Sequence, residues 1–171
     1  EKGWVILTAD YSQVELRILA HLSEDPELVA AFKKDLDIHR ATAAAVNNKS
    51  VDEVTHEERS AAKAVNFGII YGLSEFGLSK QLGISRQDAK VFIESYFARH
   101  PGVKKFIDET ISFARKNGYV KTLLGRRRPM LDINSPNQNE RQYAERTAIN
   151  MPVQGAAADM IKIAMIHIQK I

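Results

Sequence analysis

The sequence predicts an α+β fold that is mostly α-helical, and three observations lead to this assignment. Helix-start signals precede runs with helical spacing at several places, for example where Glu58 follows Thr55 by three residues. The run WVILTA at residues 4–9 is rich in β-forming residues and predicts a strand. A glycine-centred stretch at residues 119–133 favours a two-stranded hairpin. These strands are short, so helices dominate the predicted fold.

The chain opens with the predicted strand at residues 4–9, which ends at Asp10. Ser12 and Glu15 form a capping-box pattern, so a helix is expected from there to about Leu22. A carboxylate at the end of a strand is fixed by the sheet and open to a hard cation such as Mg²⁺. An aspartate before a helix is more often a turn or cap residue, so the local pattern leaves both roles open.

Residues 56–71 are predicted to form one helix with two different faces. Thr55 and Glu58 form a capping box at its start, and Gly72 is placed for a left-handed C-terminal cap. At about 100° per residue, small and apolar side chains gather on one face. Gly68 on that face costs about 1 kcal/mol relative to Ala, which indicates a close backbone approach or a need for room. The opposite stripe consists of Arg59, Lys63, Phe67 and Tyr71.

This stripe carries two cations one turn apart, followed by two aromatic rings one turn apart. Arg59 and Lys63 can meet phosphate oxygens as a planar fork and a point charge. Phe67 and Tyr71 can stack on a base or a sugar. The order along the helix therefore matches the order along a nucleoside triphosphate. The alternative is a solvated basic edge beside two core aromatics, which is the commoner arrangement for an arbitrary helix.

The remaining chain is predicted to supply scaffold helices, a hairpin and two terminal helices. Apolar positions in its middle follow helical spacing and most simply form a core. Pro152 cannot donate the helical hydrogen bond and therefore separates the last two helices. The predicted elements are a short helix opened by Asp25-Pro26, a helix opened by Asp37, helices at 75–82, 86–99 and 103–117, hairpin strands at 119–124 and 128–133, and helices at 138–149 and 153–171.

Composition and charge fit a globular protein and give weak support for nucleic-acid binding. The 171 residues are 44% hydrophobic, and Lys plus Arg exceed Asp plus Glu by 24 to 21. The sequence has no Cys and no apolar run of membrane-spanning length, so an intracellular protein is expected. Six cations and no acid lie within residues 115–128, a cluster that suits a phosphate backbone, although a solvated hairpin tip explains it equally well. The six are Arg115, Lys116, Lys121, Arg126, Arg127 and Arg128.

Three polar residues recur every four positions near the end of the chain, at Arg146, Asn150 and Gln154. Their donors can reach acceptors in a minor groove, which every correct base pair presents. Such contacts would sense the shape of a pair without reading its sequence. The alternative is ordinary hydrogen bonding near a helix end.

Three of these segments resemble motifs of the DNA polymerase I family, also called family A. Arg59-x-x-x-Lys63-x-x-x-Phe67-Gly68-x-x-Tyr71-Gly72 resembles motif B, and Asp10-Tyr11-Ser12-Gln13-Val14-Glu15-Leu16-Arg17 resembles motif A. Arg146-Thr147-Ala148-Ile149-Asn150-x-Pro152-x-Gln154-Gly155 resembles a third conserved pattern. The resemblance covers essentially the whole chain and ends before motif C. It implies a palm entry at 1–22, a fingers subdomain at 23–135 with the motif B helix at 56–71 and a basic hairpin at 119–133, and a return to the palm at 136–171.

The resemblance implies template-directed DNA synthesis, in which a primer 3′-hydroxyl attacks the α-phosphate of a deoxynucleoside triphosphate. Two Mg²⁺ ions would stabilise the attacking and leaving oxygens, with Asp10 and the Tyr11 carbonyl as metal ligands. The implied catalytic residues are Asp10, Lys63 and Arg59. The implied nucleotide-binding residues are Gln13, Glu15, His39, Arg59, Lys63, Phe67 and Tyr71. The implied DNA-binding residues are Tyr71, Gly72, Arg126, Arg127, Arg128, Arg146, Asn150 and Gln154.

The implied partners are primer-template DNA and deoxynucleoside triphosphates, and no membrane is implied. The resemblance also implies a monomer that works at the nucleoid in the bacterial cytoplasm, although a phage or organellar origin also fits. Two alternatives remain: a non-catalytic helical nucleic-acid-binding module, and a relative of single-subunit RNA polymerases. Glu15 speaks against the second, because the family places it where it leaves too little room for a ribose 2′-hydroxyl. The chain as given is expected to be inactive, since the family's second metal-binding aspartate lies beyond Ile171.

Overall fold

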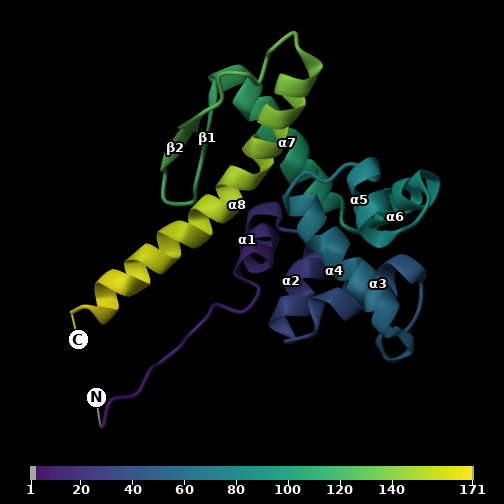
Figure 1. The fold of residues 1–171 in the computed structure, drawn as a ribbon, viewed down its shortest axis with the longest axis horizontal. Helices are drawn as coiled ribbons and strands as arrows, with labels where there is room; N and C mark the ends of the chain where they lie inside the picture. The colour runs from purple at the N-terminus through teal and green to yellow at the C-terminus, as the bar shows by residue number, and fades with distance from the viewer. Residues whose placement is uncertain (1–2, 171) are drawn as a thin grey trace.

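The structure, a computed structural model, describes residues 3–170 and is built mainly from helices (Figure 1). Only one sheet occurs in this range, an antiparallel pair that aligns Tyr119 with Pro129. No helix within it is long and apolar enough to cross a membrane. The elements are α1 (Val14–Ser23), α2 (Pro26–Lys33), α3 (Ile38–Asn47), the 3₁₀ turn η1 (Val51–Glu53), α4 (His56–Ile70), α5 (Glu75–Leu82), α6 (Arg86–Arg99), α7 (Pro101–Asn117), β1 (Tyr119–Lys121), β2 (Arg127–Pro129) and α8 (Gln138–Ile168).

Most predicted helices of the middle region are confirmed, and their caps explain their limits. The Asp25 carboxylate accepts from Leu28 N at the start of α2, and Thr55 and Glu58 form the expected capping box of α4. α5, α6 and α7 occupy nearly the predicted ranges. The hairpin is confirmed with shorter strands, because Gly125 (φ 83°) lies in a turn closed by a Thr122 N to Arg126 O hydrogen bond of 2.9 Å.

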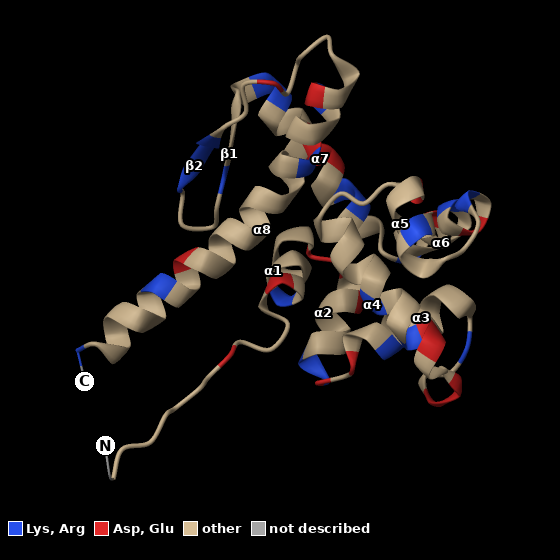
Figure 2. Ribbon diagram, viewed as in Figure 1, with Lys and Arg blue, Asp and Glu red and all other residues tan. Residues whose placement is uncertain are grey.

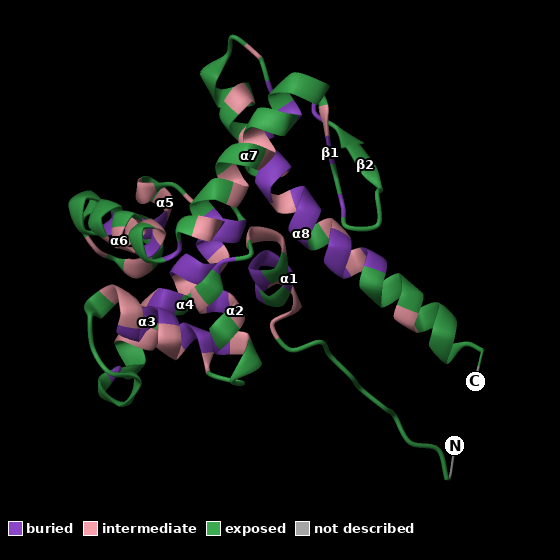
Figure 3. Ribbon diagram, turned by 180° about the vertical axis from the view of Figure 1, so that it is seen from behind, coloured by how far each residue is buried: buried purple, intermediate pink, exposed green. Residues whose placement is uncertain are grey.

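The largest buried cluster extends from the middle of α8 through α1, α2 and α4 to α5 and α6, with one residue each from α3 and α7 (Figure 1). Leu16, Leu28 and Val65 are among its almost fully buried members. A second cluster lies between α7, the hairpin and the first half of α8, around Ala114, Val120 and Ala148. α8 therefore contributes to both clusters. Figure 3 shows that burial along α8 is confined to its middle, while its C-terminal end is largely exposed.

The prediction of two terminal helices is wrong, because α8 is one helix that continues through Pro152. Proline removes one helical donor, a cost that usually ends a helix. Here Pro152 lies in the stretch of α8 that both buried clusters share, and its neighbours Met151 and Val153 are buried. Packing on both sides therefore holds the helix together across the missing hydrogen bond.

The predicted N-terminal strand is also wrong. Residues 4–9 are extended and pair with no strand within the described range, and the side chain of Ile6 is 96% exposed. A strand gains most of its stability from a paired neighbour, which this part of the structure does not contain. The Ser12 and Glu15 capping box is wrong as well. α1 begins at Val14 after a left-handed Gln13 (φ 54°), and no side chain caps it.

Candidate nucleotide and nucleic-acid site

The predicted stripe of α4 lies on the side of the helix away from its packing face. Ala62, Val65 and Ile69 are buried on that face, whereas Lys63 and Tyr71 are exposed. Gly68 is confirmed as a close approach, since a Cβ there would come within 2.6 Å of Leu73 Cδ2. The helix therefore presents cations and rings to one side, as its periodicity predicts.

The first cation of the stripe is held by an ion pair that the sequence analysis missed. Arg59 Nε lies 2.7 Å from Asp37 Oδ2, and the other Asp37 oxygen accepts from the backbone N–H groups of His39 and Arg40 at the start of α3. Burial raises the pKa of the Asp37 carboxyl, but the hydrogen bonds from Arg59 and these N–H groups outweigh it and lower the pKa. One carboxylate therefore caps α3 and orients a guanidinium on α4.

The second cation, Lys63, is exposed and forms no ion pair with any residue from 3 to 170. Phe67 comes next along the stripe and is half-buried, with its ring centroid 5.8 Å from that of His39. His39 itself is buried, with 3% of its surface exposed. The predicted phosphate-contacting histidine thus lies beneath the aromatic part of the stripe, hydrogen-bonded to Asn66, a residue that sequence reasoning did not select.

The last ring of the stripe, Tyr71, links the segment that resembles motif B to the segment that resembles motif A. The Tyr71 hydroxyl donates to Glu15 Oε2 on α1 across 3.0 Å. Burial raises the pKa of the Tyr71 hydroxyl, and the neighbouring Glu15 carboxylate raises it further, with a smaller opposing effect from Gln154. Residues from α1, α4 and α8 therefore meet at this hydroxyl, although Glu15 and Tyr71 are separated by 56 positions.

Gly72 brings the end of α4 against α8. It adopts a left-handed conformation (φ 63°), and a Cβ at this position would lie 2.7 Å from Arg146 Cγ and 3.3 Å from Arg146 Cα. Arg146 and Gln154 are exposed on α8. Asn150 between them is half-buried, and its Oδ1 is buried without a hydrogen-bond partner among the described residues. The three-residue row is thus next to the Tyr71 end of the stripe.

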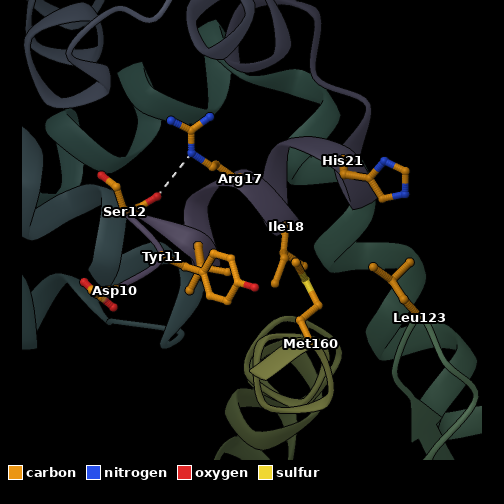
Figure 4. A pocket seen from close by; sticks show the side chains of 9 residues that line it. Asp10, Tyr11, Ser12, Arg17, Ile18, His21, Leu123 and Met160 are labelled. Atoms are coloured by element: carbon orange, nitrogen blue, oxygen red, sulfur yellow. Dashed lines mark hydrogen bonds between the residues drawn. The ribbon is translucent and has the colours of Figure 1, made fainter. Parts of the chain in front are cut away.

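Asp10 and Tyr11 lie beside a cavity of about 470 Å³ that opens between α1, α8 and the hairpin (Figure 4). Arg17 Nε donates to Ser12 O across 3.1 Å at one wall. The other walls include Ile18, His21, Leu123 and Met160. Within residues 3–170, no group of three His, Cys, Asp or Glu side chains is arranged to hold a metal ion. Asp10 therefore belongs to no such group, and the donor set described does not suit a pair of divalent ions.

The cations of the predicted basic cluster lie at the end of α7 and along the hairpin (Figure 2), and they are of two kinds, paired and exposed. Arg126 Nε lies 2.8 Å from Asp159 Oδ1, and Arg126 Nη2 donates to Gly155 O across 3.0 Å. The Thr122 hydroxyl and the Arg126 guanidinium lower the pKa of Asp159. Arg127 covers the Tyr119 ring at 4.6 Å from its centroid, and Arg128 is exposed. Arg126 therefore joins the hairpin to α8.

The fold is thus a helical domain in which α4, with its stripe of cations and rings, and the basic hairpin each contact α8. The sequence model of the family described as DNA polymerase family A matches residues 1–171, so the chain belongs to that family.

Relatives of similar sequence align with almost the whole chain. A DNA polymerase I of Caldicellulosiruptor bescii is 55% identical over 168 residues, which is 98% of this chain and 20% of that protein. A DNA polymerase I of Streptococcus pneumoniae is 56% identical over 167 residues, with 97% and 19% covered. A solved structure, described as the POL domain of Pol1 from M. smegmatis in complex with DNA primer-template and dNTP, has a TM-score of 0.90 at 47% identity, covering 94% of this chain and 28% of that one. The chain therefore spans about a fifth of the length of these curated relatives.

Proposed function

We propose that this chain is the nucleotide-binding part of a longer polymerase that carries out template-directed DNA synthesis. The observation that carries the proposal is the Tyr71 to Glu15 hydrogen bond, which joins the segments resembling motifs A and B beside the cation row of α4. The whole-chain family match and the relatives named DNA polymerase I support it. We also propose that the protein is a cytoplasmic, nucleoid-associated monomer that needs no membrane; the bacterial origin of the relatives supports only the cytoplasmic part.

In this proposal the stripe of α4 receives the incoming deoxynucleoside triphosphate. Arg59 and Lys63 bind the phosphates and compensate charge on the departing pyrophosphate, and His39 contributes a further phosphate contact. Phe67 and Tyr71 stack on the sugar and base. Gln13 and Glu15 border the sugar, where Glu15 excludes a 2′-hydroxyl by its bulk. The exposure of Lys63 and the ion pair that orients Arg59 support this assignment.

The primer-template DNA is proposed to lie along the hairpin and α8. Arg127 and Arg128 are exposed for phosphate contacts, as are Arg146 and Gln154 for a minor groove. Gly72 and Tyr71 border the templating base, and Asn150 adds a donor between its neighbours on α8. Arg126, also predicted to bind DNA, is paired with Asp159, so its contribution would be to hold the hairpin in place.

Asp10 and the Tyr11 carbonyl are proposed as one side of a site for Mg²⁺. The complete site needs acidic ligands beyond those described, since Asp10 belongs to no group of three potential ligands within residues 3–170. When bound, the ions would supply Lewis-acid stabilisation of the attacking and leaving oxygens. The chain's own residues supply phosphate binding, sugar selection and duplex contacts.

The test is primer extension by the complete polymerase with deoxynucleotides and ribonucleotides, comparing wild type with Glu15→Ala. Glu15→Ala should admit ribonucleotides, because it removes bulk beside the 2′ position, and the exposed Glu109→Ala on α7 is the matched control. No extension by the wild type would favour the nucleic-acid-binding module. A wild-type preference for ribonucleotides would favour the RNA polymerase relative. An unchanged sugar preference in Glu15→Ala would leave Glu15 as only a partner of Tyr71.

A further inference from the structure

A buried polar network joins α3 to α4 beneath the aromatic part of the α4 stripe. Asn66 on α4 is fully buried, and Thr42 and His39 on α3 are 1% and 3% exposed. Asn66 Nδ2 lies 3.1 Å from His39 Nδ1 and 3.1 Å from Thr42 Oγ1, while Thr42 Oγ1 lies 3.2 Å from Asn66 Oδ1. Buried polar groups of this kind stay only where each finds a partner. The network therefore fixes the relative position of the two helices and the plane of the His39 ring.

The chemistry of the contact sets the position of the imidazole proton. A neutral imidazole has one N–H and one bare nitrogen, and the partner of one nitrogen decides the role of the other. With the Asn66 amide nitrogen facing Nδ1, that ring nitrogen must accept. The proton then resides on Nε2, which becomes a hydrogen-bond donor.

We infer that Asn66, braced by Thr42, is a positioning residue that holds His39 as the neutral Nε2–H tautomer, so that the ring offers a donor to a phosphate oxygen. The ligand contact rests on the proposed function, whereas the tautomer rests on the α3 to α4 network alone. His39 acts directly on the ligand in this arrangement, and Asn66 acts only through His39.

The charges around the ring favour the neutral form. Burial lowers the pKa of His39, and the cations of Arg59 and Lys63 on α4 lower it further, against an opposing effect from Asp37 at the start of α3. A third positive charge beside Arg59 and Lys63 would repel both cations. A neutral donor adds a phosphate contact without that repulsion.

The opposite orientation of the Asn66 amide would place the His39 proton on the other ring nitrogen. Both amide atoms lie within 3.2 Å of Thr42 Oγ1, so Thr42 holds the amide against the His39 ring in either orientation and does not by itself select one. If the amide oxygen faced the ring, His39 Nδ1 would carry the proton and Nε2 would be bare. The tautomer of His39 therefore reports which way Asn66 points.

The test is long-range ¹H–¹⁵N correlation NMR of the 171-residue chain with labelled histidines at neutral pH. We expect His39 to show a protonated Nε2 and a bare Nδ1. Asn66→Asp should move the proton to Nδ1 and raise the pKa of His39, because a carboxylate can only accept. Asn66→Leu should leave a mixture of tautomers. Asn117→Asp, at an exposed asparagine that bonds within α7, should change nothing at His39.

Several results would overturn the inference. A wild-type His39 protonated on Nδ1 would do so without any variant, and so would a pure Nε2–H signal in Asn66→Leu. Thr42→Val, a near-isosteric change, covers the case in which the Asn66 variants do not fold, and it should loosen the tautomer preference. A titration with deoxynucleoside triphosphate is read separately. If the Nε2–H form is present but its resonance does not shift with ligand, the phosphate role fails and the positioning role stands.

Discussion

The side chains on the outer face of α4 are held by contacts with other helices, whereas the segment that carries Asp10 is largely exposed. On α4, Arg59 is oriented by Asp37, and Tyr71 is tied to Glu15. In residues 4–9, the side chains of Val5, Ile6 and Leu7 are 89%, 96% and 90% exposed, and no strand pairs with them in the described range. Both segments carry residues that the resemblance assigns to the same site.

The difference shows that the side chains proposed to bind phosphate and those proposed to bind a metal take their positions from different parts of the protein. The α4 side chains take their positions from α1, α3 and α8, all of which belong to this chain. Asp10, in contrast, follows a segment whose residues are exposed and form no helix or strand. We therefore expect substitutions beneath α4 to disturb the fold and the site together, whereas substitutions near Asp10 should leave the fold intact.

The largest contrast should come from the same substitution at two aspartates. Asp25 is fully buried and accepts from Leu28 N, Gly102 N and His100 Nδ1 at 3.1 to 3.2 Å. Asp25→Ala should lower the free energy of unfolding by about 3 to 5 kcal/mol, because it leaves buried donors without a partner. Asp10→Ala should change it by less than about 0.5 kcal/mol. Urea unfolding followed by circular dichroism measures both, and equal losses would contradict the contrast.

A smaller effect is expected at the joint between α4 and α8. Gly72→Ala should cost about 2 to 4 kcal/mol, combining left-handed backbone strain with overlap against Arg146. Gly118→Ala is the matched control, since it has φ 75° and open space around a Cβ, and should cost only about 1 to 2 kcal/mol. The difference between the two melting curves measures the contact. An equal loss of unfolding free energy in both variants would show that Arg146 on α8 moves aside to accommodate the added methyl group.

A local effect is expected at the hairpin. Arg126→Ala removes the bonds to Asp159 and Gly155, so backbone amides of β1 should exchange with solvent faster while the rest of the chain keeps its protection. Arg128→Ala, at a neighbouring exposed position, should leave that exchange unchanged. Hydrogen exchange read by NMR separates the two. Equal protection in both variants would mean that Arg126 does not hold the hairpin.

The smallest effect concerns the pH dependence of the Arg59 pair. Because the folded pKa of Asp37 is lowered below its ordinary 3.8, its ionised form stabilises the fold above that pH and loses this contribution as the pH falls through the folded pKa. Asp37→Asn should cost about 0.5 kcal/mol at pH 7, since both partners are about one-third exposed and screened. The gap to wild type should close below pH 3.8. A gap independent of pH would contradict this account.

Local signals predicted most of the helical part of the fold. The caps at Asp25 and Thr55 act within a few residues, so the starts of their helices were predicted from local sequence. The strand at residues 4–9 failed because a strand depends on a partner that local sequence does not reveal. The break at Pro152 failed because packing of its neighbours overrides the lost donor.

The candidate site was predictable where it follows helical periodicity and not where it depends on distant contacts. The stripe from Arg59 to Tyr71 follows from spacing within α4. Lys63 and Tyr71 are exposed as predicted, whereas Phe67 is half-buried against the largest core cluster. The partners of that stripe lie elsewhere: Asp37 is 22 positions from Arg59, and His39 is 27 positions from Asn66. Asp159 pairs with Arg126 across 33 positions. Only the fold brings these pairs together, and the roles of the site residues in synthesis stay predictions.

The continuity of α8 through Pro152 has a genetic consequence. Its 31 residues extend for roughly 45 Å at 1.5 Å per residue, with Gly72 resting on one section and Arg126 anchored on another. A substitution in the buried middle of α8 would therefore disturb both the Gly72 contact at the end of α4 and the Arg126 contact of the hairpin. In a screen, alleles at Ala148 or Val153 should therefore produce combined phenotypes, resembling double mutants although a single codon has changed.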